Sequence, residues 1–326
     1  MCCSLSGARQ STISLQIINP TPKFMHEFFT RNKVGWLVCA CLLFFQSPLP
    51  AREATRLLIE SGDPQLQLEL EKLVADQGLS GATERGDLAL ALVIVTDPDK
   101  PLLAEINGHE MFYAASLPKI AILLGAAVAI EEERLELTDS LYQDLTDMSR
   151  YSCNECATRV LEQVGREQLL ETLQSPEYRF YDPESDGGLW VGKDYGPGTA
   201  YRRDPLANLS HGATAFQAAR FYYKLHTGTL VSPTQSAMML ETLSRPAISH
   251  KFVKGLESFD ELEMFRKSGT WKDFHADSAL VRFAGHSYIM IALAHDQNGA
   301  LWLEQLAGRM HELAIATSKG TAVAVD

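Results

Sequence analysis

The run from Ile120 to Ile130 constrains the fold more than any other part of this chain, because it is apolar on nearly every side of a helix. Such a helix is stable in water only when other elements surround it, so we expect it at the centre of the molecule. Two polar residues stand just before it, Ser116 and Lys119. Three positions apart, their hydroxyl and ammonium groups lie on the same helix face.

The Ser116 and Lys119 pair has two interpretations. It can be a nucleophile beside its base, at a helix start whose free backbone N–H groups favour a developing anion. It can also be a helix-capping serine followed by a lysine that extends to solvent. The buried setting weakens the second interpretation, because a buried lysine needs a partner or a lowered pKa.

Residues 1–51 have the pattern of an upstream extension and an export signal. Met25 begins a basic segment, an apolar run follows from Val34 to Phe45, and Ala51 is a small residue at the expected cut. The apolar run is short for a membrane span, although an uncleaved anchor is the alternative. We therefore expect residues 1–24 to precede the true start and the protein to be exported, periplasmic or secreted.

The remaining chain, residues 52–326, is expected to form one domain. The sequence has 326 residues, of which 46% are hydrophobic, enough to bury a full core. Its formal net charge of −12 repels nucleic acid and anionic lipid. We expect a monomer with no nucleic-acid partner and no stable membrane insertion after signal cleavage. Only Cys153 and Cys156 remain beyond the signal, as two buried thiols or a local disulfide.

Apolar runs between turn residues predict two early strands and three late ones. The second early strand turns at Asn107-Gly108 toward Met111–Ala115, so the helix after Ser116 is expected to emerge from a hairpin. The strands are expected at residues 88–96, 102–106, 264–271, 278–283 and 287–295.

Helical periodicity covers most of the remaining chain. Helices are expected at residues 63–78, 138–148, 154–173, 214–225, 233–243 and 300–316. Residues 178–211 are rich in glycine and proline without periodicity, which is typical of a functional loop. We predict an α+β fold, an α/β/α sandwich, with a five-stranded antiparallel sheet from both chain ends and an all-helical lobe inserted at about 117–250.

Two further polar motifs accompany S-x-x-K at Ser116. Ser152-Cys153-Asn154 lies between two predicted helices, and Lys267-Ser268-Gly269-Thr270 lies on the first late strand. The order S-x-x-K, S-x-N, K-[ST]-G resembles the class A β-lactamase and penicillin-binding serine hydrolase superfamily. The resemblance covers about residues 55–316 and implies a β-lactamase/transpeptidase-like fold.

The resemblance implies a role for each residue of the motifs. Ser116 would be the acylated nucleophile, Lys119 its hydrogen-bonded partner, and Ser152 the relay of a proton to the leaving nitrogen. Backbone N–H groups of Ser116 and Thr270 would form the oxyanion hole. The residues that would bind substrate are Asn154 for the amide carbonyl, Lys267 and Ser268 for the carboxylate, and Thr270.

Hydrolysis of the acyl-enzyme needs a base that activates water. The family pattern Arg-x-Glu-Pro-x-x-Asn is matched best at residues 202–208, where Asp204 would be the base and Asn208 its positioning partner. An aspartate is one methylene shorter, and a displacement of about 1 Å can lower a rate by about 10²-fold. If Asp204 only forms an Asp-Pro turn, the acyl-enzyme persists and the protein behaves as a penicillin-binding protein.

Two positions near the third motif are further expectations. Trp271 either narrows the substrate channel or packs in the core. The strand register that the family implies for Asp277 places His275 near the substrate carboxylate. No histidine or cysteine pattern predicts a metal site, and no glycine-rich loop predicts a nucleotide cofactor.

The function expected from the sequence is an exported serine hydrolase that acts through an acyl-enzyme at Ser116. Hydrolysis of a β-lactam amide is the first expectation, with a small-molecule β-lactam or a peptidoglycan-like peptide as substrate. A D-alanyl-D-alanine carboxypeptidase, or another penicillin-binding, amide or ester hydrolase, is the alternative. A catalytically inactive ligand-binding or sensor domain is the non-enzymatic alternative, and three intact motifs argue against it.

Overall fold

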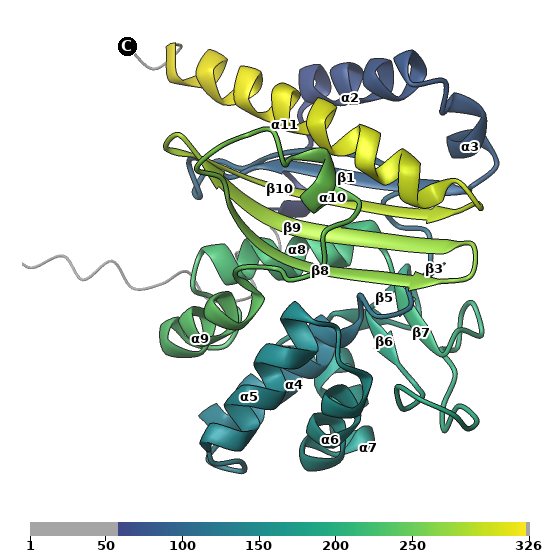
Figure 1. Ribbon diagram of the computed structural model, residues 1–326, viewed down its shortest axis with the longest axis vertical. Coiled ribbons are helices and arrows are strands. Elements are labelled where there is room, and N and C mark those ends of the chain that lie inside the picture. Colours follow the sequence, from purple (N-terminus) through teal and green to yellow (C-terminus); the bar gives the residue numbers. More distant parts are fainter. Residues whose placement is uncertain (1–57, 324–326) are drawn as a thin grey trace, which may run out of the picture. The chain divides into compact units, whose positions relative to one another are not determined.

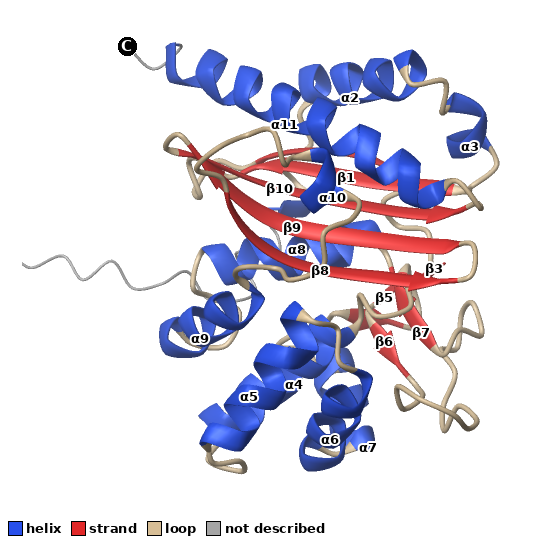
Figure 2. Cartoon of the chain, viewed as in Figure 1, coloured by secondary structure: helices blue, strands red, loops and turns tan. Residues whose placement is uncertain are grey.

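Both ends of the described chain contribute strands to one antiparallel sheet (Figures 1 and 2). A computed structural model describes residues 58–323, with side chains as far as residue 320. The strand order is β2-β1-β10-β9-β8, and β1 pairs with β10, which joins the early and late parts of the chain. The predicted five-stranded sheet is confirmed. Its strands are β1 (Leu88–Ile94), β2 (Leu102–Ile106), β8 (Glu263–Trp271), β9 (Phe274–Phe283) and β10 (His286–His295).

Helices cover both faces of the sheet. The face toward α2 (Pro64–Asp76), α10 (Phe252–Gly255) and α11 (Gly299–Val323) forms one apolar core, and the face toward α8 (Ala215–His226) belongs to another (Figure 1). Strand β1 is buried along its whole length, with alternate residues in the two cores. This explains why its sequence is a continuous apolar run rather than an alternating pattern.

The apolar helix α4 (Lys119–Glu131) lies at the centre of a helical layer, as the sequence predicts. Every side chain from Lys119 to Ala129 is buried. Helix α4 contacts each of α5 (Asp139–Arg150), α6 (Asn154–Val164), α7 (Arg166–Gln174) and α9 (Pro233–Leu243). The single helix expected over residues 154–173 is divided into α6 and α7 at Gly165, whose φ of 91° ends the first helix.

The segment before Ser116 differs from the expected hairpin. Strand β3 (Phe112–Tyr113) pairs with β7 (His211–Ala213), not with β2. The loop expected over residues 178–211 contains three more strands, β4 (Tyr181–Asp182), β5 (Gly187–Gly188) and β6 (Trp190–Val191). Strands of two or three residues are too short to give a periodic signal. The short helix α3 (Ser80–Glu84) is also absent from the sequence-based expectations, as is α10.

The expected export signal and its cleavage point lie outside the described residues. Within residues 58–323, no helix combines the length and the apolar character that crossing a bilayer requires.

Candidate active site

Ser116 lies in a tight turn directly before α4, not at the helix cap. Ala115 has a φ of 51°, and the Leu117 N–H donates to the Ala114 carbonyl over 3.0 Å. Helix α4 begins at Lys119, and no side chain caps its start. A positive φ at a residue other than glycine costs about 1–3 kcal/mol. The turn is therefore held in an unfavourable conformation that presents Ser116 beside α4.

Strand β8 approaches this turn closely because residue 269 is glycine. A Cβ atom at Gly269 would lie 2.1 Å from the Ala114 carbonyl oxygen and 2.8 Å from the Ser116 nitrogen. Any side chain at this position would push the free edge of β8 away from the turn. The glycine of the K-S-G motif thus brings the strand against the backbone N–H of Ser116.

The Lys119 side chain is 1% exposed, and its ammonium is surrounded by acceptors. Nζ donates to the Ser152 carbonyl over 2.6 Å and to Asn154 Oδ1 over 2.7 Å, while the Tyr195 ring centre lies 4.5 Å away. Burial lowers the pKa of Lys119 to about 7, although the negative charge of Glu155 opposes this. An amine with this pKa is partly neutral at neutral pH and can accept a proton.

Lys267 of β8 also contacts Ser152, which lies in the turn between α5 and α6. Its Nζ donates to Ser152 Oγ over 2.9 Å and to the Ser268 carbonyl over 2.8 Å. Lys119 Nζ is 3.4 Å from the same hydroxyl. Burial, together with the positive charge of Lys119, lowers the pKa of Lys267. Ser152 Oγ therefore lies between two amines, an arrangement through which a proton can pass.

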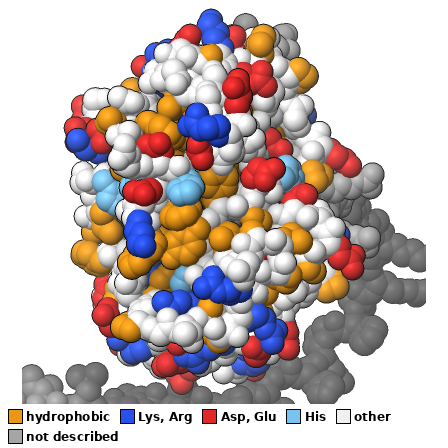
Figure 3. Space-filling view, turned by 90° about the vertical axis from the view of Figure 1, so that its right-hand side faces the viewer, with side chains coloured by type: hydrophobic (Ala, Val, Ile, Leu, Met, Phe, Trp, Pro, Cys, Tyr) orange, Lys and Arg blue, Asp and Glu red, His pale blue; other side chains and the backbone are white. Residues whose placement is uncertain are grey.

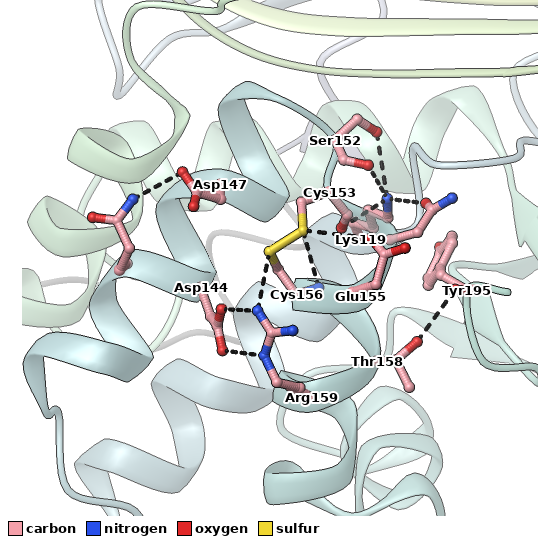
Figure 4. The surroundings of a disulfide bond; sticks show 12 residues. Lys119, Asp144, Asp147, Ser152, Cys153, Glu155, Cys156, Thr158, Arg159 and Tyr195 are labelled. Atoms are coloured by element: carbon pink, nitrogen blue, oxygen red, sulfur yellow. Dashed lines mark hydrogen bonds and ion pairs between the residues drawn. A yellow bond between two sulfur atoms is a disulfide. The ribbon is translucent and has the colours of Figure 1, made fainter.

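A disulfide joins Cys153 to Cys156 next to Ser152 (Figure 4). The Cys156 N–H donates to Cys153 Sγ, so the disulfide caps the start of α6. Arg159 binds Asp144 with two hydrogen bonds and also contacts Cys156 Sγ. Of the two alternatives that the sequence leaves open, the structure has the disulfide. It stiffens the turn that supplies acceptors to the Lys119 ammonium.

A cavity of about 440 Å³ lies beside Ser116. Trp271 is 57% exposed and lines this cavity, so it does not pack in the core. Figure 3 views the side of the molecule that carries the β8–β9 turn and shows hydrophobic side chains gathered between charged ones. The lining residues are Tyr113, Ala115, Ser116, Asn154, Lys193, Asp194, Tyr195, Gly196, Pro197, His211, Thr270 and Trp271.

A comparison against protein families identifies the family of this chain. A model of the β-lactamase enzyme family matches residues 87–316, which include all three motifs. The chain belongs to the β-lactamase enzyme family. It is therefore a serine hydrolase of the β-lactamase type, as the resemblance in the sequence implies.

Solved structures with the same fold include β-lactamases and a penicillin-binding protein. A β-lactamase from Sphaerobacter thermophilus has a TM-score of 0.58 at 16% identity, covering 76% of this chain and 95% of that one. PBP-A has a TM-score of 0.57 at 17% identity, covering 78% and 97%. A β-lactamase from Chitinophaga pinensis has a TM-score of 0.59 at 12% identity, covering 78% and 99%. No curated protein matches. Identities this low establish the fold alone.

The structure does not bring Asp204 and Asn208 to the cavity of this β-lactamase-family protein. Asp204 is 2% exposed, and its carboxylate accepts hydrogen bonds from the Tyr181 hydroxyl and from the N–H groups of Leu206 and Ala207. Asn208 is exposed, with a φ of 56°. The short Asp204 side chain binds backbone N–H groups of its own loop. Neither residue of the expected water-activating pair therefore lines the cavity beside Ser116.

Three other expected site residues direct their side chains elsewhere. Ser268, Thr270 and His275 lie on the sheet face opposite Lys267 and Gly269, because Thr270 pairs with His275 and side chains alternate along β8. His275 is buried and does not line the cavity, so the expected substrate contact is not seen. Thr270 does border the cavity, and its backbone is the part that the expected oxyanion hole requires.

Four polar or charged residues that line the cavity were not predicted as site residues from the sequence. They come from the glycine- and proline-rich stretch, and that composition was the only signal for them. Tyr195 is the most central of them, since its hydroxyl donates to the Ala115 carbonyl over 3.3 Å and its ring faces Lys119. Burial raises the pKa of Tyr195, so its hydroxyl stays neutral. The four residues are Lys193, Asp194, Tyr195 and His211.

Proposed function

We propose that this protein is acylated at Ser116 by a β-lactam or a chemically similar amide. The observation that carries the proposal is the environment of Lys119, a buried amine with a pKa of about 7 that binds the Ser152 turn and Asn154 beside the cavity. A serine hydroxyl is a poor nucleophile unless a neighbouring base removes its proton. Lys119 in its neutral form is such a base.

The proposed acylation assigns one task to each group. Neutral Lys119 accepts the proton of the Ser116 hydroxyl while the oxygen attacks the amide carbonyl. The Ser116 and Thr270 N–H groups stabilise the oxyanion. When the carbon–nitrogen bond breaks, Ser152 Oγ gives its proton to the leaving nitrogen and takes one from the Lys119 ammonium, with Lys267 also in contact with the hydroxyl. The product is an ester of Ser116.

We propose further that this ester is hydrolysed slowly. Asp194 is the carboxylate that lines the cavity within the described residues, and Arg166 binds both of its oxygens over 2.8 Å. The Asp204 carboxylate accepts hydrogen bonds from the Tyr181 hydroxyl and from its own loop, and a neutral tyrosine ring, Tyr195, faces Lys119. Within the described residues, no carboxylate that lines the cavity is therefore free to act as a base for a water molecule at the ester. This favours the behaviour of a penicillin-binding protein, and a mutant of PBP-A is known as an acyl-enzyme complex with penicillin G.

Sustained β-lactam hydrolysis is the second candidate function, and the match to the β-lactamase family favours it. Incubation with a chromogenic cephalosporin, followed by mass spectrometry of the intact protein, distinguishes the two. We expect one equivalent of product, a stable adduct on Ser116 and slow turnover after it. Continuous turnover would replace the first candidate with the second. Absence of both turnover and an adduct in the wild type would reject both candidates, and Ser116→Ala is the control that cannot be acylated.

We also propose that the protein is exported. The Cys153–Cys156 disulfide supports this, because disulfides persist in oxidising compartments and are rare in the cytosol. Cell fractionation, followed by alkylation of free thiols and peptide mass spectrometry, tests the proposal. We expect the protein outside the cytoplasm, with both cysteines oxidised. A protein that is found in the cytoplasm with reduced cysteines would contradict it.

A further inference from the structure

Another buried lysine, in addition to Lys119 and Lys267, lies against the strand that carries the K-S-G motif. Lys251 is 2% exposed and directly precedes α10. Its Nζ donates to the Gly269 carbonyl over 2.6 Å, to Thr270 Oγ1 over 2.8 Å and to the Ala276 carbonyl over 3.1 Å. It occupies the sheet face opposite Lys267, and none of the acylation steps above uses it.

The contacts of Lys251 show which way the carbonyl and the N–H of the Gly269–Thr270 peptide point. Gly269 and Ala276 face each other across β8 and β9, and one ammonium reaches both carbonyl oxygens when both point between the two strands. In a trans peptide the N–H points away from the preceding carbonyl. The Thr270 N–H therefore points to the free edge of β8, which borders the cavity lined by Ser116.

We propose that Lys251 is a positioning residue for acyl transfer, whose ammonium polarises the Gly269–Thr270 peptide and strengthens the Thr270 N–H as a donor to the oxyanion. The proposal rests on the proposed acylation at Ser116. A peptide whose carbonyl accepts a hydrogen bond from a cation has a more positive N–H, because hydrogen bonds in series polarise one another. Lys251 thus acts on the reacting oxygen through one peptide unit without touching substrate.

The fold holds Lys251 at this carbonyl in an unfavourable backbone conformation. Its φ is 51° and its ψ is −118°, a region that glycine adopts more readily. The next residue, Phe252, donates its N–H to Asp277 Oδ2, and Arg266 binds both oxygens of the same carboxylate. Arg266 also donates to the His250 carbonyl. The buried ion pair therefore holds the loop that delivers the Lys251 ammonium.

The charge of Lys251 depends on the groups around it. These are Asp277 and His275 on β9, Arg266 and Lys267 on β8, and His250 on the same loop. Burial lowers the pKa of Lys251 to about 8, an effect that Asp277 opposes and Arg266 increases. The ammonium is present below this pH and is lost above it. The polarisation should therefore fade on the alkaline side of the acylation profile.

The test compares Lys251→Met, which removes the charge, with Lys251→Arg, which keeps a cation that does not deprotonate. Acylation by a fluorescent penicillin is followed by stopped flow, so that the maximal rate is separated from the half-saturating concentration. We expect Lys251→Met to lower the maximal rate about 10-fold with little change in the half-saturating concentration. Lys251→Arg should retain most of the rate and move the alkaline limb to higher pH. The matched control is Lys224→Met, which removes another buried lysine that does not line the cavity.

The infrared stretch of the Ser116 ester carbonyl is a second readout, because it reports the strength of the oxyanion-hole hydrogen bonds. We expect it at higher frequency in Lys251→Met and near the wild-type value in Lys251→Arg. If Lys251→Met does not fold, Lys251→Gln keeps a donor without the charge and replaces it. A wild-type rate and frequency in the neutral variant, or an unmoved alkaline limb in Lys251→Arg, would overturn the proposal. A wild type that is not acylated would instead reject the proposed function.

Discussion

The protonation state of Lys119 decides whether Ser116 is a nucleophile, because only a neutral amine accepts a proton. Since burial lowers the pKa of Lys119 to about 7, the neutral fraction grows as the pH rises through that value. We expect the second-order rate constant of acylation to rise about tenfold per pH unit below pH 7 and to level off between about pH 7 and 8, before the alkaline limb. A stopped-flow profile between pH 5 and 8 measures this.

The variant that tests the role of neutral Lys119 is Lys119→Arg, because arginine cannot lose its proton. We expect it to lower the acylation rate by about 10²- to 10⁴-fold. A flat pH profile in the wild type, or an arginine variant that acylates normally, would show that another group removes the proton from Ser116.

Asp204 is the residue whose expected role the structure alters most. Its carboxylate accepts hydrogen bonds from the Tyr181 hydroxyl and from its own loop. We expect Asp204→Asn to lower the free energy of unfolding by about 1–3 kcal/mol, because buried donors lose their acceptor. The lifetime of the acyl-enzyme should change little, since the carboxylate does not line the cavity. Urea unfolding and the decay of the adduct by mass spectrometry measure the two effects. A much longer-lived adduct with unchanged stability would restore the water-activating role.

Among the elements, the start of α6 places several candidate site residues and the disulfide within a few positions of one another. Ser152 and Asn154 lie on either side of Cys153 of the disulfide, and both contact Lys119. We expect the double variant Cys153→Ser, Cys156→Ser to be less stable by about 2 kcal/mol, from the loop-closure entropy that a disulfide removes from the unfolded chain. Acylation should slow severalfold, because the acceptors around the amine become mobile. Thermal unfolding and stopped-flow acylation measure both.

A reducing agent is the control for the disulfide. It should lower the stability and the rate of the wild type toward those of the double variant and leave the double variant unchanged. A wild type that keeps its melting temperature and rate after full reduction would show that the backbone alone holds this turn.

How well an element was predicted depends on its length and on its periodic signal. Helix α2 begins after Asp63, whose carboxylate caps it as expected, and β2 covers the predicted residues. These elements have long apolar patterns or strong capping residues. The pairing of β3 with β7 was missed, because it joins residues about a hundred positions apart through only two pairs. No local pattern encodes such a contact.

At the scale of the whole molecule, helices from both chain ends cover the same face of the sheet. Helix α11 buries Leu303, Leu306 and Met310 against the face that α2 also covers. We expect deletion of residues 299–326 to give an insoluble protein, because several large apolar side chains of the sheet would be exposed. Deletion of residues 320–326 alone should leave the melting temperature within a few degrees. Solubility and calorimetry test both, and a soluble, cooperatively folding product of the larger deletion would contradict the expectation.

The sequence by itself determined the sheet, the central helix and the motif residues Ser116, Lys119, Ser152, Asn154 and Lys267, which the structure brings together. Periodicity and short motifs are local, and a chain carries them whatever its final packing. Only the tertiary structure decided that the Asp204 carboxylate binds Tyr181 and its own loop, that Cys153 and Cys156 are joined, and that Lys251 lies under the Gly269 carbonyl. These depend on the direction of side chains and on which distant strands meet, and both arise from packing.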